Sequence, residues 1–262
     1  MNWTAVSKKE HYKKTFAKVG TYNFFKNRSV SEICYFELNK AASVFPLFFS
    51  RINNVTLLFA LMGLDRDKNL FVSEEGKWEV PRFLPAAMAS YPFRIGQASS
   101  GDKILLYLEE SRMITDDPTA IPLFDETGEP AAILQRYMKL LAAVESRRDE
   151  FQKSCELLYE CGLLEPLTLI DPLKDWLFKD FNPLSLNFKA MRELSDKEFL
   201  ELRESFALEC AFAQHFSLEN FHRINVLRGI KMQGKAMMSN LGTQIFDEEE
   251  PDLDFNLQSN VK

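Results

Sequence analysis

The sequence of residues 47–62 is LFFSRINNVTLLFALM. Two apolar runs, 47–49 and 55–62, flank polar residues that end in Asn53-Asn54. Short apolar runs rich in Phe, Val and Leu on either side of such a pair are typical of two antiparallel strands joined by a tight turn. This stretch therefore predicts a β-hairpin, and the neighbouring segments are interpreted as parts of the sheet that it starts.

Turn residues continue on the C-terminal side of the hairpin. Residues 63–69 supply a turn before the apolar run 70–72, and the acidic pair and glycine within 73–78 suit a second hairpin turn. On the N-terminal side, apolar positions in 31–45 recur at helical spacing, which predicts a short helix that ends before Pro46.

The rest of the first half mixes a short helix with further strands. Residues 82–91 predict a helix that Pro92 stops, because proline cannot continue a helix. Residues 104–108 predict a strand whose partner is 93–98, across a polar turn. The first half is thus predicted to be strand-rich and antiparallel.

The second half changes to helical periodicity. From Pro130 the apolar residues recur at three- and four-residue steps, which predicts one long helix with Gly162 as its C-cap. Residues 164–170 and 183–191 are predicted to be extended. Ser195 and Glu198 have capping-box spacing and open the last predicted helix, which runs to about Phe216.

These elements predict an α+β fold, with an antiparallel, strand-rich N-terminal half containing short helices and a helix-rich C-terminal half that shares the core. The folded part is predicted to be a single domain over 1–245, and whether it divides into lobes at 1–129 and 130–245 is left open. Residues 246–262 carry six acidic residues without apolar spacing, which predicts a disordered acidic tail.

Composition narrows the class of protein. With 262 residues, 46% hydrophobic and 27% charged, the chain matches a folded globular protein rather than a disordered or collagen-like chain. The net charge of −6 repels phosphate backbones, so nucleic acid is not an expected partner. No secretory signal and no uninterrupted apolar span are found, and the chain is expected to be cytoplasmic with no transmembrane segment.

No short catalytic or metal-binding signature is present. Cys34, Cys155, Cys161 and Cys210 do not have zinc or disulfide-framework spacing, so they are expected to be free thiols without metal. Serine-hydrolase motifs, phosphate-binding loops and zinc-protease motifs are missing, and no cofactor is expected. His215 is the one histidine considered for a binding or acid–base role, although local hydrogen bonding near a helix end is the more common use.

One segment combines aromatic and arginine side chains on a backbone stiffened by prolines. Such groups suit ligand or partner recognition, and the tentative binding residues, together with His215, are Trp78, Arg82, Tyr91, Phe93 and Arg94. The alternative, which is the more common case, is that the aromatic rings fill the core while the arginines stay in water.

Further short stretches form an ordered pattern along the chain: Leu61-Met62-Gly63-Leu64, Asn69-Leu70-Phe71-Val72, Gly76-Lys77-Trp78, Leu84-Pro85-Ala86, Tyr91-Pro92-Phe93, Leu123-Phe124-Asp125, Gly162-Leu163-Leu164-Glu165-Pro166, Leu194-Ser195-Asp196 and Ala213-Gln214-His215-Phe216-Ser217. In order and spacing they resemble the SapC family of bacterial proteins over about residues 10–228. The chain departs from the family pattern at Asn27-Arg28-Ser29, where relatives tend to be more apolar or to have histidine, and at Phe206, where they often have glycine.

The resemblance implies an accessory or binding protein rather than a defined enzyme. Members like this one are often encoded beside genes for outer-membrane receptors, flavin-dependent halogenase-like proteins and cupin-like proteins, so action with halogenase-like or receptor systems is implied. The family supplies no agreed catalytic residues to carry over. Two alternatives stay open: an enzyme or enzyme subunit with an arginine and carboxylate site, and a surface-layer component that would need an export route.

Overall fold

The computed structural model describes residues 2–80, 83–97, 104–114, 117, 119–168 and 173–233. Arg82, one of the tentative binding residues, lies outside the described residues. So does the acidic segment 246–262 for which disorder is predicted.

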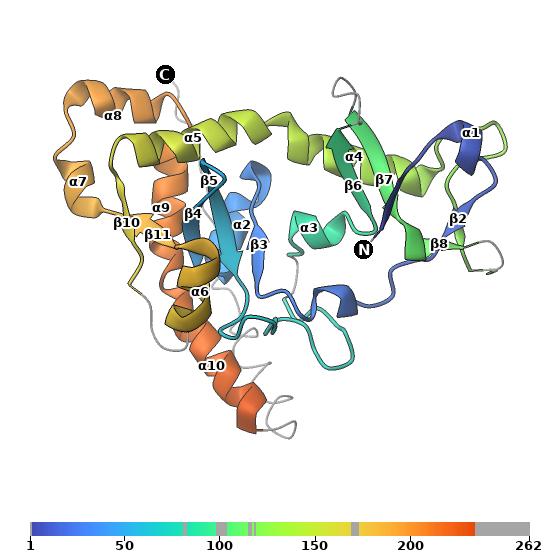
Figure 1. Ribbon diagram of the computed structural model, residues 1–262, viewed down its shortest axis with the longest axis horizontal. Coiled ribbons are helices and arrows are strands. Elements are labelled where there is room, and N and C mark those ends of the chain that lie inside the picture. The colour runs from blue at the N-terminus through green and yellow to red at the C-terminus, as the bar shows by residue number, and fades with distance from the viewer. Residues whose placement is uncertain are drawn as a thin grey trace, which may run out of the picture.

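The predicted hairpin of residues 47–62 is confirmed and forms the centre of the largest sheet (Figure 1). Strand β4 (Leu47–Ile52) pairs antiparallel with β5 (Val55–Leu61), from Leu47 opposite Ala60 to Ile52 opposite Val55. Asn53 and Asn54 have φ angles of 51° and 64°. Two successive residues with positive φ make the tight turn whose twist suits a hairpin, and Asn tolerates that conformation.

This sheet takes strands from both halves of the chain. Its order is β10-β11-β4-β5-β3, where β3 is Val30–Glu32, β10 is Leu164–Pro166 and β11 is Leu184–Leu186. All of its pairs are antiparallel. The predicted turn at 73–78 is also present, since Val72 bridges to Trp78 and Gly76 has a φ of 77°.

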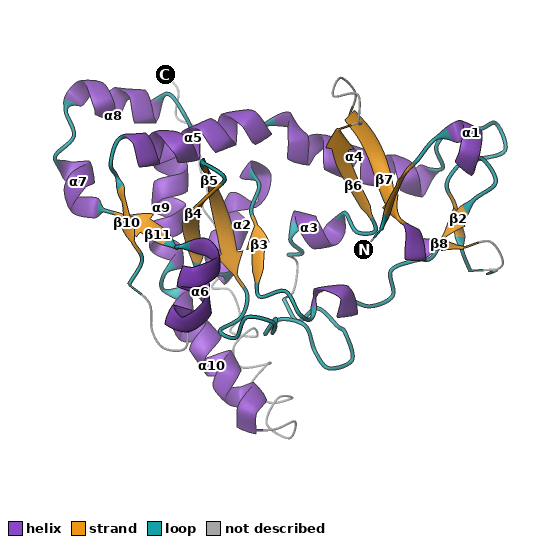
Figure 2. Cartoon of the chain, in the orientation of Figure 1, coloured by secondary structure: helices purple, strands orange, loops and turns teal. Residues whose placement is uncertain are grey.

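Two smaller antiparallel sheets lie on the other side of the molecule (Figure 2). The first has the order β1-β7-β6, and its pairing of β6 (Phe93–Gln97) with β7 (Ile104–Glu109) confirms the predicted partnership. Strand β1 is Trp3–Ala5. The second sheet has the order β8-β2-β9, with bounds Met113–Ile114, Thr15–Phe16 and Ile121–Pro122.

The helices are concentrated in the second half of the chain. Their bounds are α1 Lys8–His11, α2 Leu38–Val44, α3 Ala86–Ala89, α4 Ala132–Ser146, α5 Arg148–Glu160, α6 Leu173–Phe181, α7 Phe188–Arg192, α8 Asp196–Arg203, α9 Ala207–Ser217 and α10 Asn220–Gln233, with 3₁₀ turns η1 Asn23–Phe25, η2 Tyr35–Glu37 and η3 Glu110–Arg112. No helix in the described part of the chain is both long enough and apolar enough to cross a bilayer.

The long helix predicted after Pro130 is broken in two. Arg147, with φ −129° and ψ 17°, separates α4 from α5, and its guanidinium lies over the rings of Tyr35 and Phe206 at 5.2 and 5.3 Å. Apolar periodicity could not show this break, because the spacing continues across one non-helical residue. The predicted end is right: Gly162, with a φ of 67°, follows α5.

Other predicted elements differ in extent from the structure. Of the helix predicted over 82–91, only α3 (Ala86–Ala89) is α-helical among the described residues. Within 31–45 the chain first completes β3 and turns through η2, so only α2 is α-helical. Within 183–191 only β11 is extended, because the Asn187 side chain accepts a hydrogen bond from the Ala190 N–H and starts α7.

The helix opened by the Ser195–Glu198 capping box is α8, and it ends at Arg203. The Ser154 hydroxyl accepts the Phe206 N–H at 3.1 Å in the interruption before α9, and α10 follows as a further helix.

The main hydrophobic core joins the two halves. It includes Phe48, Leu58 and Leu61 of the β4–β5 hairpin together with Leu158 of α5 and Ala211 of α9. A second cluster under the β6–β7 sheet includes Phe16, Phe93 and Leu134. The predicted α+β class is therefore confirmed, with antiparallel sheets mostly from the N-terminal half and most helices in the C-terminal half.

Candidate functional site

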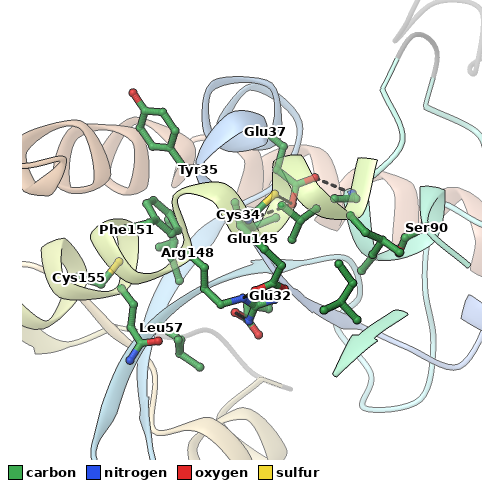
Figure 3. A pocket seen from close by; sticks show the side chains of 18 of the residues that line it. Glu32, Cys34, Tyr35, Glu37, Leu57, Ser90, Glu145, Arg148, Phe151 and Cys155 are labelled. Carbon is green, nitrogen blue, oxygen red and sulfur yellow. Dashed lines mark hydrogen bonds and ion pairs between the residues drawn. The ribbon is translucent and has the colours of Figure 1, made fainter. Parts of the chain in front are cut away.

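A cavity of about 200 Å³ lies where the α4–α5 break passes over the end of β3 (Figure 3). Strands β3, β5 and β6, helices α3, α4 and α5 and the 3₁₀ turn η2 all contribute to its wall. The lining residues are Glu32, Ile33, Cys34, Tyr35, Glu37, Thr56, Leu57, Leu58, Ala86, Ala87, Ser90, Arg94, Ile95, Leu141, Val144, Glu145, Arg148, Phe151, Gln152 and Cys155.

The lengths of two neighbouring strands explain why space is left here. Strand β3 ends at Glu32, which pairs with Phe59, whereas β5 starts four residues earlier than Phe59, at Val55. The chain then leaves the sheet into η2, so most of β5 before Phe59 has no strand neighbour on that side. The break at Arg147 places the end of α4 and the start of α5 over this gap.

Arg148 lies between two carboxylates at the solvent side of the cavity (Figure 3). Its Nε and Nη2 donate to Glu145 at 2.8 and 2.7 Å, while its Nη1 lies 3.8 Å from Glu32. The Glu145 pair is therefore a two-point, charge-assisted contact and the Glu32 pair is longer and weaker. Burial raises the pKa of Glu32 despite the opposing charge of Arg148.

Glu37 forms a second polar cluster deeper in the wall. Its side chain is buried, and it accepts hydrogen bonds from the Ala86 N–H at 2.7 Å and from the Cys34 N–H at 3.1 Å. Burial raises the pKa of Glu37, and these two hydrogen bonds oppose the rise. The arrangement ties η2 to the start of α3.

The Cys34 thiol donates to Glu37 at 3.3 Å. Burial, followed by the neighbouring Glu37 charge, raises the pKa of the Cys34 thiol. A thiol is nucleophilic as the thiolate, so Cys34 is not set up for nucleophilic catalysis.

Thr56 provides an unsatisfied polar atom in the lining. The residue is fully buried, and its Oγ1 has no hydrogen-bond partner among the residues that the structure describes. Buried hydroxyls normally find a partner, since an unmet one costs about 1–3 kcal/mol. Leu58 and Cys155, also buried, line the same cavity, so this hydroxyl belongs to an otherwise largely apolar interior.

Of the tentative binding residues, Arg94 lines this cavity. It is exposed on β6, and its guanidinium lies 4.3 Å from the ring of Trp3. Phe93 is buried in the second core cluster, and Tyr91 is buried with its hydroxyl between Glu109 and Arg112.

Trp78 and His215 lie elsewhere. Trp78 packs against the main core and donates its indole N–H to the Phe83 carbonyl at 2.6 Å. His215, on α9, contacts the rings of Phe188 on α7 and Phe216 on α9, and it is not among the cavity residues.

The four cysteines are free, and Cys155 and Cys210 are buried. Among the described residues, no group of three or more His, Cys, Asp or Glu side chains is placed to hold a metal ion.

Sequence reasoning missed the residues that make the cavity polar. Glu32 belongs to a segment interpreted as helix, and Glu145 and Arg148 belong to a helix interpreted as continuous. The three-residue step from Glu145 to Arg148 is the one local signal that was available, because such a step can bring opposite charges together on a helix. That signal is common on solvated surfaces and does not by itself indicate a site.

Comparison with known proteins identifies a family but no individual relative. The model of the SapC family matches residues 6–224, which include every residue that lines the cavity. No curated protein and no solved structure matches the chain.

Proposed function

We propose that this chain, which belongs to the SapC family, is a binding protein for one compact organic molecule that occupies the cavity beside Arg148. The observation that carries the proposal is a preformed cavity that combines apolar walls with a few converging polar groups. Small-molecule sites typically have this composition.

The size of the cavity limits the ligand. An engineered apolar cavity of roughly 150 Å³ in another protein binds benzene. About 200 Å³ therefore suits a single ring with a short substituent. Larger cofactors such as flavins or dinucleotides do not fit within this volume.

The cavity is charged on its solvent side and apolar inside, and this arrangement would orient a bound ligand. Glu32 and Arg148 are about half exposed, whereas Ile33, Leu58 and Cys155 are buried. An apolar body would lie against the buried residues, and a polar group would lie near the charged ones. Arg94, one of the tentative binding residues, lines the cavity from β6 and would lie near the ligand.

A fragment panel tests the proposal. Ligand-observed NMR with ring-sized fragments should identify molecules that bind the wild-type protein saturably. Val144→Trp fills the cavity with an indole and should abolish this binding, because Val144 lines the cavity. Ala143→Trp adds the same group at an exposed position on the same helix and is the matched control.

Binding that survives in Val144→Trp, or a panel without hits, would contradict the proposal. Both variants should keep the wild-type far-ultraviolet circular dichroism spectrum, so that loss of binding is not confused with loss of the fold.

A second candidate is an enzyme that uses the same carboxylates. Glu32 and Glu37 both line the cavity with pKa values raised by burial, and a carboxyl group with a raised pKa can act as a general acid. The two candidates differ in what happens to a bound fragment. A binding protein returns it unchanged after long incubation, whereas an enzyme yields a new species in the NMR spectrum.

A role beside halogenase-like or outer-membrane receptor systems remains a prediction from the resemblance. Affinity purification of the tagged chain from its native cell, followed by mass spectrometry of proteins and small molecules, checks it.

A further inference from the structure

The cavity lining has more carboxyl groups than guanidinium groups. Glu32, Glu37 and Glu145 line it, and Arg148 is the cation that contacts two of them. Two of the Arg148 nitrogens are already committed to Glu145. The remaining cation in the lining, Arg94, has its guanidinium over the rings of Trp3 and Tyr107, at 4.3 and 5.5 Å.

Glu32 is therefore the carboxylate with the weakest compensation. The contact to Arg148 is 3.8 Å long, and among the described residues no hydrogen-bond donor reaches the Glu32 carboxylate oxygens. By contrast, Glu145 has two short hydrogen bonds from Arg148, and Glu37 has two from backbone N–H groups. A partly desolvated carboxylate with so little compensation favours a nearby positive charge. The raised pKa of Glu32 agrees with this reading.

Thr56 supplies a second, independent indication of a ligand. Its hydroxyl is fully buried in the lining and has no partner in the described part of the chain. A ligand with a hydrogen-bonding group on its ring or linker would satisfy it. The cavity thus has one weakly paired carboxylate near solvent and one hydroxyl inside that has no partner among the described residues.

We infer that the ligand is a compact organic cation, in which an ammonium group pairs with Glu32 and a ring-sized apolar body lies against Ile33, Leu58 and Val144. This inference rests on the proposed function, because it names the chemical class of the molecule that the cavity takes. An anionic ligand would add a further negative charge to a site whose three carboxyl groups already outnumber its two guanidinium groups, Arg148 and Arg94. A neutral ligand would give the Glu32 carboxylate no positive charge beyond its weak contact with Arg148.

Three probes of nearly equal shape separate these classes: 2-phenylethylamine, 2-phenylethanol and phenylacetate. Isothermal titration at neutral pH and low ionic strength should give the tightest binding for the amine, at least tenfold tighter than for the alcohol. Phenylacetate should bind weakest. Added salt should reduce the advantage of the amine, because the interaction is an ion pair near solvent.

Variants assign the preference to individual residues. Glu32→Gln keeps the shape and removes the charge, so the amine should lose about tenfold in affinity while the alcohol is unchanged. Glu201→Gln makes the same replacement at an exposed position on α8 and should leave both affinities unchanged. Thr56→Val removes the hydroxyl with little change in shape and should not lower the stability, because that hydroxyl makes no hydrogen bond to lose.

The outcomes distinguish this inference from the proposed function. If the alcohol binds as tightly as the amine, or if Glu32→Gln leaves the amine affinity unchanged, the cation preference is wrong while a binding cavity remains. If none of the three probes binds although the fragment panel gives hits that Val144→Trp removes, the cation class is again wrong and the cavity stands. If the panel also fails, the proposed function fails with it.

Discussion

The backbone N–H of Ala86 donates a 2.7 Å hydrogen bond to the buried carboxylate of Glu37, which lies 49 residues earlier in the chain. The same carboxylate accepts from the N–H and the thiol of Cys34. Glu37 thus connects the 3₁₀ turn after β3 with the start of α3, and both segments form part of the cavity wall.

The first prediction concerns this connection. Glu37→Ala leaves two backbone N–H groups without their acceptor in a buried place, and each such group costs about 1–3 kcal/mol. We expect the free energy of unfolding to fall by about 3 kcal/mol, measured by urea denaturation. Glu201→Ala, on the exposed face of α8, is the control and should change it by less than about 0.5 kcal/mol. A loss of similar size in both variants would contradict the structural role of Glu37.

The second prediction is the pH dependence that Glu37 causes. Its pKa in the folded protein is raised above 4.5 by burial, so between these two pKa values the folded state binds more protons than the unfolded state. The contribution of Glu37 is therefore fully present below pH 4.5 and is lost as the pH rises through the folded pKa. Wild-type stability should fall relative to that of Glu37→Gln as the pH rises from 4.5 to neutral, in urea titrations at several pH values. A difference that stays constant, or that moves in favour of the wild type, would show that the pKa is not raised.

The third prediction ranks the thiols. Burial raises the pKa of Cys34, whose thiol donates to Glu37, and Cys155 and Cys210 are buried. Cys161 is partly exposed, as Cys34 is, and burial also raises its pKa, but among the described residues its thiol lacks the hydrogen bond to a carboxylate that Cys34 makes with Glu37. Iodoacetamide in mildly alkaline buffer should therefore label Cys161 first and the other three slowly, as mass spectrometry of peptides would show. All four should react in denaturant, and faster labelling of Cys34 than of Cys161 would contradict the ranking.

The fourth prediction compares two neighbours on β6. Phe93 is buried and contacts the rings of Phe16 and Tyr137 at centroid distances of 5.0 and 4.7 Å, so Phe93→Ala should cost roughly 3–5 kcal/mol of stability. Arg94 is exposed and its main contact is with Trp3, so Arg94→Ala should cost no more than about 1 kcal/mol. Thermal melting of both variants checks the contrast. Equal losses would mean that Arg94 is as important to packing as the phenylalanine beside it.

Local chemistry in the sequence determined several elements with their ends. The Asn53-Asn54 turn fixes the β4–β5 hairpin, the Ser195 hydroxyl and Glu198 carboxylate cap α8, and Gly162 ends α5 with a positive φ. Each of these features depends on interactions between residues a few positions apart. Residue type and spacing were therefore sufficient to predict them, and the α+β class follows from the order of the elements.

The cavity was decided by the tertiary structure. Arg147 separates α4 from α5, and its guanidinium lies over the rings of Tyr35 and Phe206. Phe206 precedes the separate helix α9, and its N–H donates a hydrogen bond to the Ser154 hydroxyl. These breaks place Arg148 near Glu32. Whether a charged side chain stays in water or faces an opposite charge across a cavity depends on which distant elements pack together, and that packing is a property of the whole core rather than of any local spacing.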